Sequence, residues 1–170
     1  MLRPLLVNGT LLLIAILLAV AVWLTTEQNN QTQKVTLTNL TPSQISKIVI
    51  ENGSDPAIHI ERNADKWMIT QPSKAQADNA KIEKLLQIAQ SNSIRRFTAP
   101  TDLTEFGLNP PQAILTLNKA SIEMGTLHPM NQRRYVRVGN LIHLTNDRFY
   151  HLLQSAPQSL TSQTDKENEQ

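Results

Sequence analysis

The stretch that decides the fold runs from Lys47 to Glu61: Lys47-Ile-Val-Ile-Glu51, Asn52-Gly-Ser-Asp-Pro56 and Ala57-Ile-His-Ile-Glu61. Two runs rich in β-branched residues flank a loop of Asn, Gly, Ser, Asp and Pro, which predicts a β-hairpin. In the second run Ile58 and Ile60 fall on one face of the strand and His59 on the other, because strand side chains alternate. The pattern indicates a strand pair with one apolar face.

The sequence that follows contains one convincing helix, Asp78 to Gln90. Asp78 is a suitable N-cap, and the apolar residues that follow recur at helical spacing to form one stripe. A shorter apolar alternation predicts a closing helix over Asp147–Gln154. Further strands are expected at Lys66–Thr70, Ile94–Thr98, Gln112–Leu117, Ser121–Leu127, Arg133–Val138 and Leu141–Thr145, the last two joined by a tight hairpin at Gly139-Asn140.

The N-terminal stretch Leu5–Leu24 is apolar except for Asn8, Gly9 and Thr10. As a helix its length would be about 30 Å, which matches the hydrocarbon core of a bilayer. The stretch predicts a transmembrane anchor whose expected lipid-facing residues are Leu5, Leu11, Ile14, Leu18, Trp23 and Leu24.

An alternative for this stretch is a cleaved signal peptide, because Ala19-Val-Ala21 has the small-x-small arrangement of a cleavage site. Cleavage would release a freely soluble periplasmic protein. The apolar run continues past that site to Leu24, which favours an anchor. Arg3 precedes the helix, so we expect a single-pass inner-membrane protein with a cytoplasmic N-terminus and a periplasmic C-terminal domain.

The fold class predicted from these patterns is α+β: an N-terminal transmembrane helix followed by one domain with a mainly antiparallel β-sheet and one main amphipathic helix. A parallel sheet is disfavoured because most strand pairs lack a crossover helix. The expected domains are a cytoplasmic stub and anchor (1–24), a linker (25–33), an extracytoplasmic α+β domain (34–155) and a disordered polar tail (156–170).

Composition narrows the functions further. The 170 residues contain 16 Lys and Arg against 14 Asp and Glu and no cysteine. A balanced charge argues against nucleic acid, and the lack of cysteine removes disulfides and thiolate chemistry. The four histidines lack metal-site spacing, and no nucleophile or phosphate-loop motif is present. We therefore expect no catalytic residue, no metal and no cofactor.

Five of the eight arginines fall in two short segments, Arg95-Arg96 and Arg133-Arg134-x-x-Arg137. They form a possible docking patch for anionic lipid headgroups or an acidic partner. The alternative is a solvated strand face whose charges protect a sheet edge. On a strand, Arg133, Tyr135 and Arg137 share one face, while Arg134 shares the other with Val136 and Val138.

The order of several short motifs is characteristic. Trp67-Met-Ile-Thr-Gln-Pro72 leads to Ala77-Asp78 and the helix; Phe106-Gly-Leu-Asn-Pro110, Met124-Gly125 and Arg134-Tyr135-Val136 follow. This order resembles DUF4340, a bacterial domain-of-unknown-function family of membrane-anchored extracytoplasmic proteins, with Phe106 and Met124 replacing a tyrosine and an isoleucine. The resemblance covers about Val49 to Leu153. The matching residues are Trp67, Pro72, Asp78, Gly107, Leu108, Pro110, Gly125 and Tyr135.

These matching residues also have plain structural explanations. Trp67 is typical of a core residue, Pro72 of a strand end, and Gly107 to Pro111 of a turn. The family resemblance implies a partner, because similar proteins are associated with auxiliary components of gliding-type ABC transporters.

Taken together, the sequence predicts a non-enzymatic, membrane-anchored periplasmic interaction module. Its expected role is that of an accessory subunit of a membrane complex such as an ABC-type transporter. Its expected contacts are the lipid bilayer and a membrane protein, with no nucleic acid; the oligomeric state is left open. The alternative is a periplasmic enzyme or ligand-binding protein acting on cell-envelope material.

Overall fold

The computed structural model describes residues 13–18, 20, 35–53, 55–130, 132–156 and 160–161. Internal contacts divide the chain into two units, Met1–Lys34 and Val35–Gln170. In the first unit, residues 13–18 and 20 are helical and exposed. The second unit contains the sheet, the remaining helices and the buried cores.

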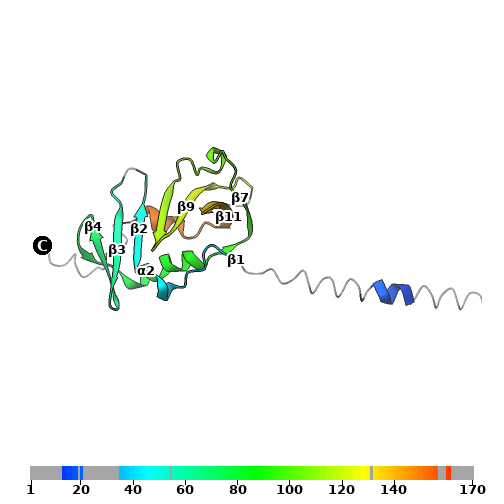
Figure 1. Ribbon diagram of the computed structural model, residues 1–170, viewed down its shortest axis with the longest axis horizontal. Helices are drawn as coiled ribbons and strands as arrows, with labels where there is room; N and C mark the ends of the chain where they lie inside the picture. Colours follow the sequence, from blue (N-terminus) through cyan, green and yellow to red (C-terminus); the bar gives the residue numbers. More distant parts are fainter. Residues whose placement is uncertain are drawn as a thin grey trace, which may run out of the picture. The chain divides into compact units, whose positions relative to one another are not determined.

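The second unit is built on a sheet in which nine described strands pair, every one antiparallel to its neighbours (Figure 1). A separate short pair joins β1 (Val35–Thr36) to β6 (Asn92–Ser93). In spatial order the large sheet consists of β5 (Ala75–Gln76), β4 (Lys66–Gln71), β3 (Ile58–Asn63), β2 (Lys47–Glu51), β8 (Ala113–Leu117), β9 (Ala120–Leu127), β10 (Arg133–Val138), β11 (Leu141–Asn146) and β7 (Arg95–Thr98).

The hairpins expected from the sequence are confirmed. β2 pairs with β3, with Ile48 opposite Ile60 and Ile50 opposite Ile58, and these four side chains are buried. β10 and β11 meet at a two-residue turn that begins with Gly139 at a φ of +58°. Positive φ suits glycine because it lacks a Cβ.

The expected amphipathic helix is also confirmed, but its last turn is a 3-10 helix. α2 spans Asn79–Leu86, and the Asp78 carboxylate accepts the backbone N–H of Ala80 at 2.9 Å. The chain then tightens into the 3-10 helix η2 (Gln87–Gln90). The closing helix α3 (Tyr150–Gln154) is shorter than expected, and η1 (Pro42–Gln44) and η3 (Thr104–Phe106) are single 3-10 turns.

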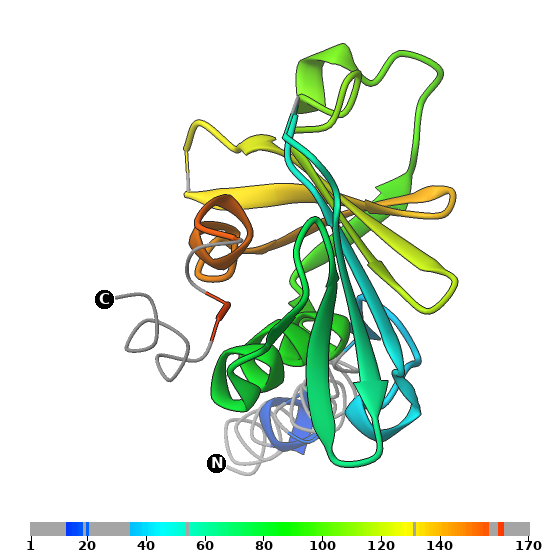
Figure 2. The same cartoon turned by 90° about the vertical axis from the view of Figure 1, so that its left-hand side faces the viewer.

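The main core lies on one face of the sheet. α2 and α3 lie on the same side of the curved sheet in Figure 2. Their apolar stripes pack against the buried strand residues, as the fully buried Ile82, Leu85 and Leu153 illustrate. Burying an aliphatic side chain of this size contributes about 1.5–3 kcal/mol, so this layer provides most of the cohesion of the domain.

A second, smaller core lies on the opposite face. Phe106, Leu108 and Ile142 are buried there, and Phe97 and Tyr135 pack against them. Tyr135 follows Arg134 and precedes Val136, both buried toward the main core, and neighbouring strand residues point to opposite faces. The loop between β7 and β8 thus covers part of the sheet face that the helices leave open.

The predicted fold class is wrong. The domain is mainly an antiparallel β-sheet with few helices. The second face is covered by the loop around Phe106 where an α+β domain would place more helix, and the long predicted helix is divided into α2 and η2.

The transmembrane part of that prediction is also corrected. In the described part of the chain, no helix is long and apolar enough to cross a membrane. The helical residues 13–18 rise only about 9 Å. Of the expected anchor residues, Ile14 and Leu18 are helical and exposed, whereas Leu5, Leu11, Trp23 and Leu24 lie outside the described residues.

The C-terminal segment closes one end of the sheet. Ala77, next to β5, forms a bridge with Thr161, and the Asp78 N–H donates to the carbonyl of Leu160 at 2.8 Å. Leu160 is fully buried. These two residues fall within the range 156–170 that was expected to be a polar tail; residues 157–159 and 162–170 lie outside the described residues.

Candidate interaction surface

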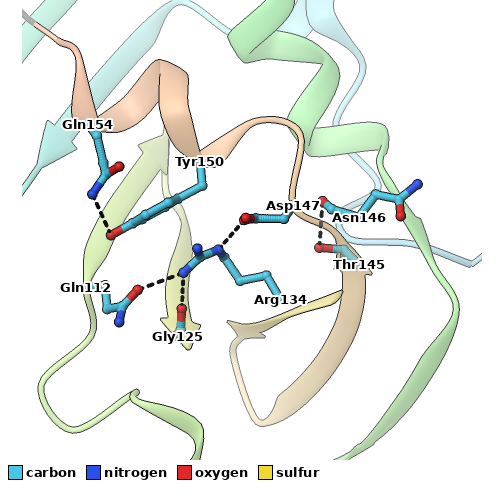
Figure 3. A network of polar contacts seen from close by, with 8 residues as sticks. All are labelled: Gln112, Gly125, Arg134, Thr145, Asn146, Asp147, Tyr150 and Gln154. Carbon is cyan, nitrogen blue, oxygen red and sulfur yellow. Dashed lines mark hydrogen bonds and ion pairs between the residues drawn. The ribbon is translucent and has the colours of Figure 1, made fainter. Parts of the chain in front are cut away.

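The five clustered arginines do not form one patch, and Arg134 is the clearest departure from it. Its side chain is 5% exposed and points into the main core (Figure 3). It forms an ion pair with Asp147, donates to the carbonyl oxygen of Gly125 and donates to Gln112 Oε1 at 2.7 Å. Arg134 therefore has protein partners in several directions.

The remaining face of that guanidinium lies against an aromatic ring. Its central carbon is 3.5 Å from the centroid of the Tyr150 ring, and Gln154 Nε2 hydrogen-bonds the Tyr150 hydroxyl at 3.2 Å (Figure 3). A cation over an aromatic face is attracted by the ring quadrupole. The adjoining cavity, of about 10 Å³, holds one water at most. The network fastens α3 to the sheet and offers no room for a ligand.

Arg137 lies on the opposite sheet face and is also engaged. Its Nε and Nη2 atoms donate to the two carboxylate oxygens of Glu123 at 2.8 and 2.7 Å. This two-point hydrogen bond is the main reason that the pKa of Arg137 is raised. Arg133, at the start of β10, is half-buried. Arg134 and Arg137 therefore serve to hold neighbouring elements together.

Arg95 and Arg96 form the exposed remainder of the predicted patch. Both lie on β7 and both side chains are exposed. Arg95 is opposite Leu144 and Arg96 opposite His143, so the two arginines project to opposite faces of the sheet. Neither takes part in an ion pair among the described residues.

β7 is the last strand of the sheet, and its outer edge is open. The Ala99 N–H donates to the carbonyl of Asn140 at 2.9 Å, so the backbone of Ala99 faces β11. Because the facing groups alternate along an antiparallel strand, the backbone of Phe97 faces β11 as well. The N–H and C=O groups of Arg96 and Thr98 must then point away from β11. Among the described residues, no backbone group bonds to them from that side.

Four of the eight motif residues that carry the family resemblance meet at the second core. Gly107 lies at φ +63°, and a Cβ there would overlap the Thr126 side chain; a Cβ at Gly125 would overlap the Phe106 carbonyl oxygen. The Tyr135 ring packs edge-on against Phe106, with centroids 5.0 Å apart, and Leu108 is buried. The glycines let the loop lie directly on the sheet.

The other motif residues have separate positions. Trp67 is buried in the main core, and the guanidinium of Arg62 lies 5.8 Å from its ring centroid. Asp78 caps α2. Pro72 and Pro110 are exposed and follow cis peptide bonds. None of these positions gathers polar groups around a reacting centre.

His143 on β11 is a buried polar residue. Alternation on the strand with Ile142 predicts a solvent-facing histidine, yet His143 is only 3% exposed. Its Nδ1 atom lies 3.0 Å from Ser93 Oγ. Burial, with a smaller contribution from the charge of Arg96, lowers the pKa of His143. The missed signal is that both faces of β11 are covered at this point: Ile142 lies in the second core, and Ser93 of β6 lies against His143.

Two shallow hollows occur on the described surface. One, of about 260 Å³, is lined by Ile94, Asn146, Arg148 and their neighbours; another, of about 250 Å³, lies beside Asn52 and Pro72. Within the described residues, no group of three or more His, Cys, Asp or Glu is placed to hold a metal ion. The open β7 edge with its two arginines is thus the most distinctive surface feature.

Within the described residues, fold and surface together define a small antiparallel β domain whose sheet edge at β7 is open. The family described as "Domain of unknown function (DUF4340)" matches residues 67–161, more than half of the chain. The chain belongs to this family, as its motifs predict. Comparison with curated proteins gives no significant match, and comparison with solved structures gives none either.

Proposed function

We propose that this protein is a non-enzymatic interaction module of the bacterial cell envelope that binds a membrane-protein partner through the β7 edge of its sheet. The proposed location is the periplasmic side of the inner membrane. The proposed role is that of an accessory subunit, for example of an ABC-type transporter, the class of partner that the DUF4340 resemblance implies.

The observation that carries this proposal is the difference between the two ends of the sheet. At the β5 end, Ala77 and Asp78 bond to the chain's own Leu160–Thr161 segment. At the β7 end, the outward backbone groups of Arg96 and Thr98 have no such cover among the described residues. A strand edge of this kind is a template for pairing with another chain.

The edge is also rigid enough to serve as a template. β7 is bonded along its inner side to β11, and the Phe97 ring packs at 5.6 Å from that of Phe106 in the second core. A pre-ordered strand needs little further ordering on binding, which reduces the entropic cost of association.

The experiment that tests the proposal is affinity purification of the full-length, C-terminally tagged chain from crosslinked, detergent-solubilised membranes. We expect the same inner-membrane protein in independent preparations, and none with an unrelated tagged periplasmic protein. Fractionation, with protease added to intact spheroplasts, tests the location: the domain should be in the membrane fraction and digested. Absence of any reproducible membrane partner contradicts the proposed function.

The alternative function is a periplasmic enzyme or ligand-binding protein for envelope material. The two hollows described above, of about 250 and 260 Å³, fall below the usual range of about 300–1,000 Å³ for ligand pockets. An envelope fragment that raises the unfolding temperature of the chain would favour this alternative over the interaction module.

A further inference from the structure

We infer that the partner contributes an extended, acidic segment that adds to β7 as a further strand. This inference rests on the proposed function and specifies the chemistry of the partner. It follows from three features of β7: the direction of its unpaired backbone groups, the alternation of its two arginines, and the lack of an ion pair for either arginine among the described residues.

The backbone of β7 sets the shape of the occupant. Arg96 and Thr98 direct two N–H and two C=O groups outward, as the pairing of their neighbours with β11 requires. An extended chain placed beside them can satisfy all of these groups in one antiparallel ladder. Pro100 limits the contact at one end, because it has no N–H to donate.

The side chains of β7 set the charge of the occupant. Arg95 and Arg96 project to opposite faces, and an added strand alternates with the same period. Two consecutive carboxylate residues would therefore place one carboxylate beside each arginine. Because the added strand is antiparallel, the residue before the acidic pair would lie beside Phe97, which is half-buried against the second core and suits an apolar side chain.

Neither arginine of this edge takes part in an ion pair among the described residues. Asp147, which follows β11, is engaged by Arg134, and the exposed Asp102 and Glu105 lie in the loop that follows β7. Arg96 influences the neighbouring His143, which is buried in its neutral form. The hollow beside Ile94, the residue before Arg95, is lined by the exposed Arg148, which adds a cation at the start of β7.

A protein segment fits this surface better than a lipid headgroup does. An anionic headgroup can pair with Arg95 or Arg96, but it cannot supply alternating donors and acceptors along Arg96 and Thr98. The two arginines also face opposite sides of the sheet, so a flat bilayer surface cannot contact both equally. The membrane is therefore an alternative outcome of the test.

The test measures binding of a fluorescent peptide, acetyl-Thr-Val-Asp-Glu-Val-Thr-amide, to the full-length chain by anisotropy. Its comparison peptides replace Asp-Glu by Lys-Lys, or carry N-methyl groups on alternate residues. The protein variants are Thr98→Pro, which removes an outward N–H but no bond to β11, and the pair R95A/R96A. The control pair K66A/K119A makes the same change of charge at exposed sites elsewhere.

The expected result is that the acidic peptide binds at least tenfold more tightly than the lysine peptide. Thr98→Pro and R95A/R96A should each weaken binding about tenfold, K66A/K119A should leave it within twofold, and the N-methylated peptide should not bind. If Thr98→Pro fails to fold, as judged by its unfolding temperature, the N-methylated peptide still tests the backbone contact.

Several results would overturn the inference. One is that no peptide binds. A second is that binding survives both Thr98→Pro and N-methylation. A third is that vesicles with 30% anionic lipid bind in a way that R95A/R96A abolishes and Thr98→Pro does not, which would assign the arginines to the membrane. A fourth is that the R95A/R96A variant self-associates while the wild type binds no peptide. The arginines would then serve to prevent pairing between the edges of two copies.

The failure of this inference is distinguishable from the failure of the proposed function. If wild type, Thr98→Pro and R95A/R96A all retain the same membrane partner in the affinity purification, the protein is an interaction module that uses another surface. If the wild type retains none, the proposed function itself fails.

Discussion

The guanidinium of Arg134 has a carboxylate, an amide oxygen, a carbonyl oxygen and an aromatic ring as partners. Replacing Arg134 by Ala would leave Asp147 and the carbonyl of Gly125 without their cation in a buried site. Removing one member of a buried pair typically costs about 3–5 kcal/mol. We expect R134A to lose roughly that much unfolding free energy in urea titrations.

The matched control is Arg137→Ala. The Arg137 side chain is more exposed than that of Arg134, at 29% against 6%, and pairs near the surface contribute about 0–1 kcal/mol. Equal losses in the two variants would contradict the structural role assigned to Arg134.

Gly125 gives a second prediction at the residue scale. A methyl group there would overlap the backbone oxygen of Phe106, so the loop and β9 would have to separate. We expect Gly125→Ala to cost about 1–3 kcal/mol, the usual range for overpacking. The measurements are the unfolding free energy by chemical denaturation and the near-ultraviolet circular dichroism of Tyr135, which should weaken as its packing loosens. In the control Gly53→Ala the added group has no atom within 4 Å, but the φ of +52° strains the backbone; we expect this variant to lose some stability and still to retain the native Tyr135 signal.

His143 makes stability depend on pH. Because its folded pKa lies below its ordinary value of about 6.5, the unfolded chain binds protons more readily than the folded one as the pH falls past that value. Stability is complete above about pH 6.5 and decreases as the pH is lowered toward the folded pKa. His143→Gln should remove this decrease in thermal scans, and Arg96→Gln should reduce it. An unchanged slope in H143Q would contradict the assignment.

The sequence contained part of this information. Arg134 alternates in phase with Val136 and Val138, which already indicates the inner face, but arginine is so seldom buried that its residue type argued for solvent. For His143 the same alternation predicts a solvent-facing side chain, because it assumes that only one face of the sheet is covered. Its burial depends on β6, whose Ser93 contacts the His143 ring and lies 50 residues away in the sequence.

At the scale of elements, the C-terminal segment is the least obvious contributor to stability. Leu160 is fully buried although it lies in a polar stretch. We expect Leu160→Ala to cost about 2–5 kcal/mol, as for other buried leucines, and to expose the β5 edge. Leu152→Ala, at a half-buried position in α3, should cost clearly less in the same unfolding assay. Equal costs would mean that Leu160 is not packed as described.

Hydrogen exchange provides a direct test of the β7 edge. The amides of Phe97 and Ala99 face β11, and those of Arg96 and Thr98 face outward. The first two should be protected and the last two should exchange rapidly in the isolated chain. Addition of the acidic peptide should slow Arg96 and Thr98 selectively. Protection of all four amides in the isolated chain would show that the edge is already covered.

Elements set by local chemistry were predictable. The Asp78 cap with its apolar stripe and the glycine turn at Gly139 each lie within a few residues, and both are found where expected. The lengths of α2 and α3 were overestimated, because an apolar stripe continues through a 3-10 turn as easily as through a helix.

At the scale of the whole molecule, the order of strands in the sheet could not be predicted from the sequence. β2 pairs with β8, more than sixty residues later, and β7 is placed beyond β11 although it precedes β8 in the chain. Such pairings depend on which apolar faces fit together after the hairpins form, and no local pattern encodes them. The open edge could not be located before this order was known.

That order has a consequence for how such molecules assemble. A sheet that can be extended at both ends behaves like a bifunctional monomer and can polymerise indefinitely. In the described part of the chain, Leu160 and Thr161 bond beside β5 at one end, whereas the β7 end has no such cover. Like a chain terminator in polymer chemistry, each copy can join one neighbouring strand and then stops further growth.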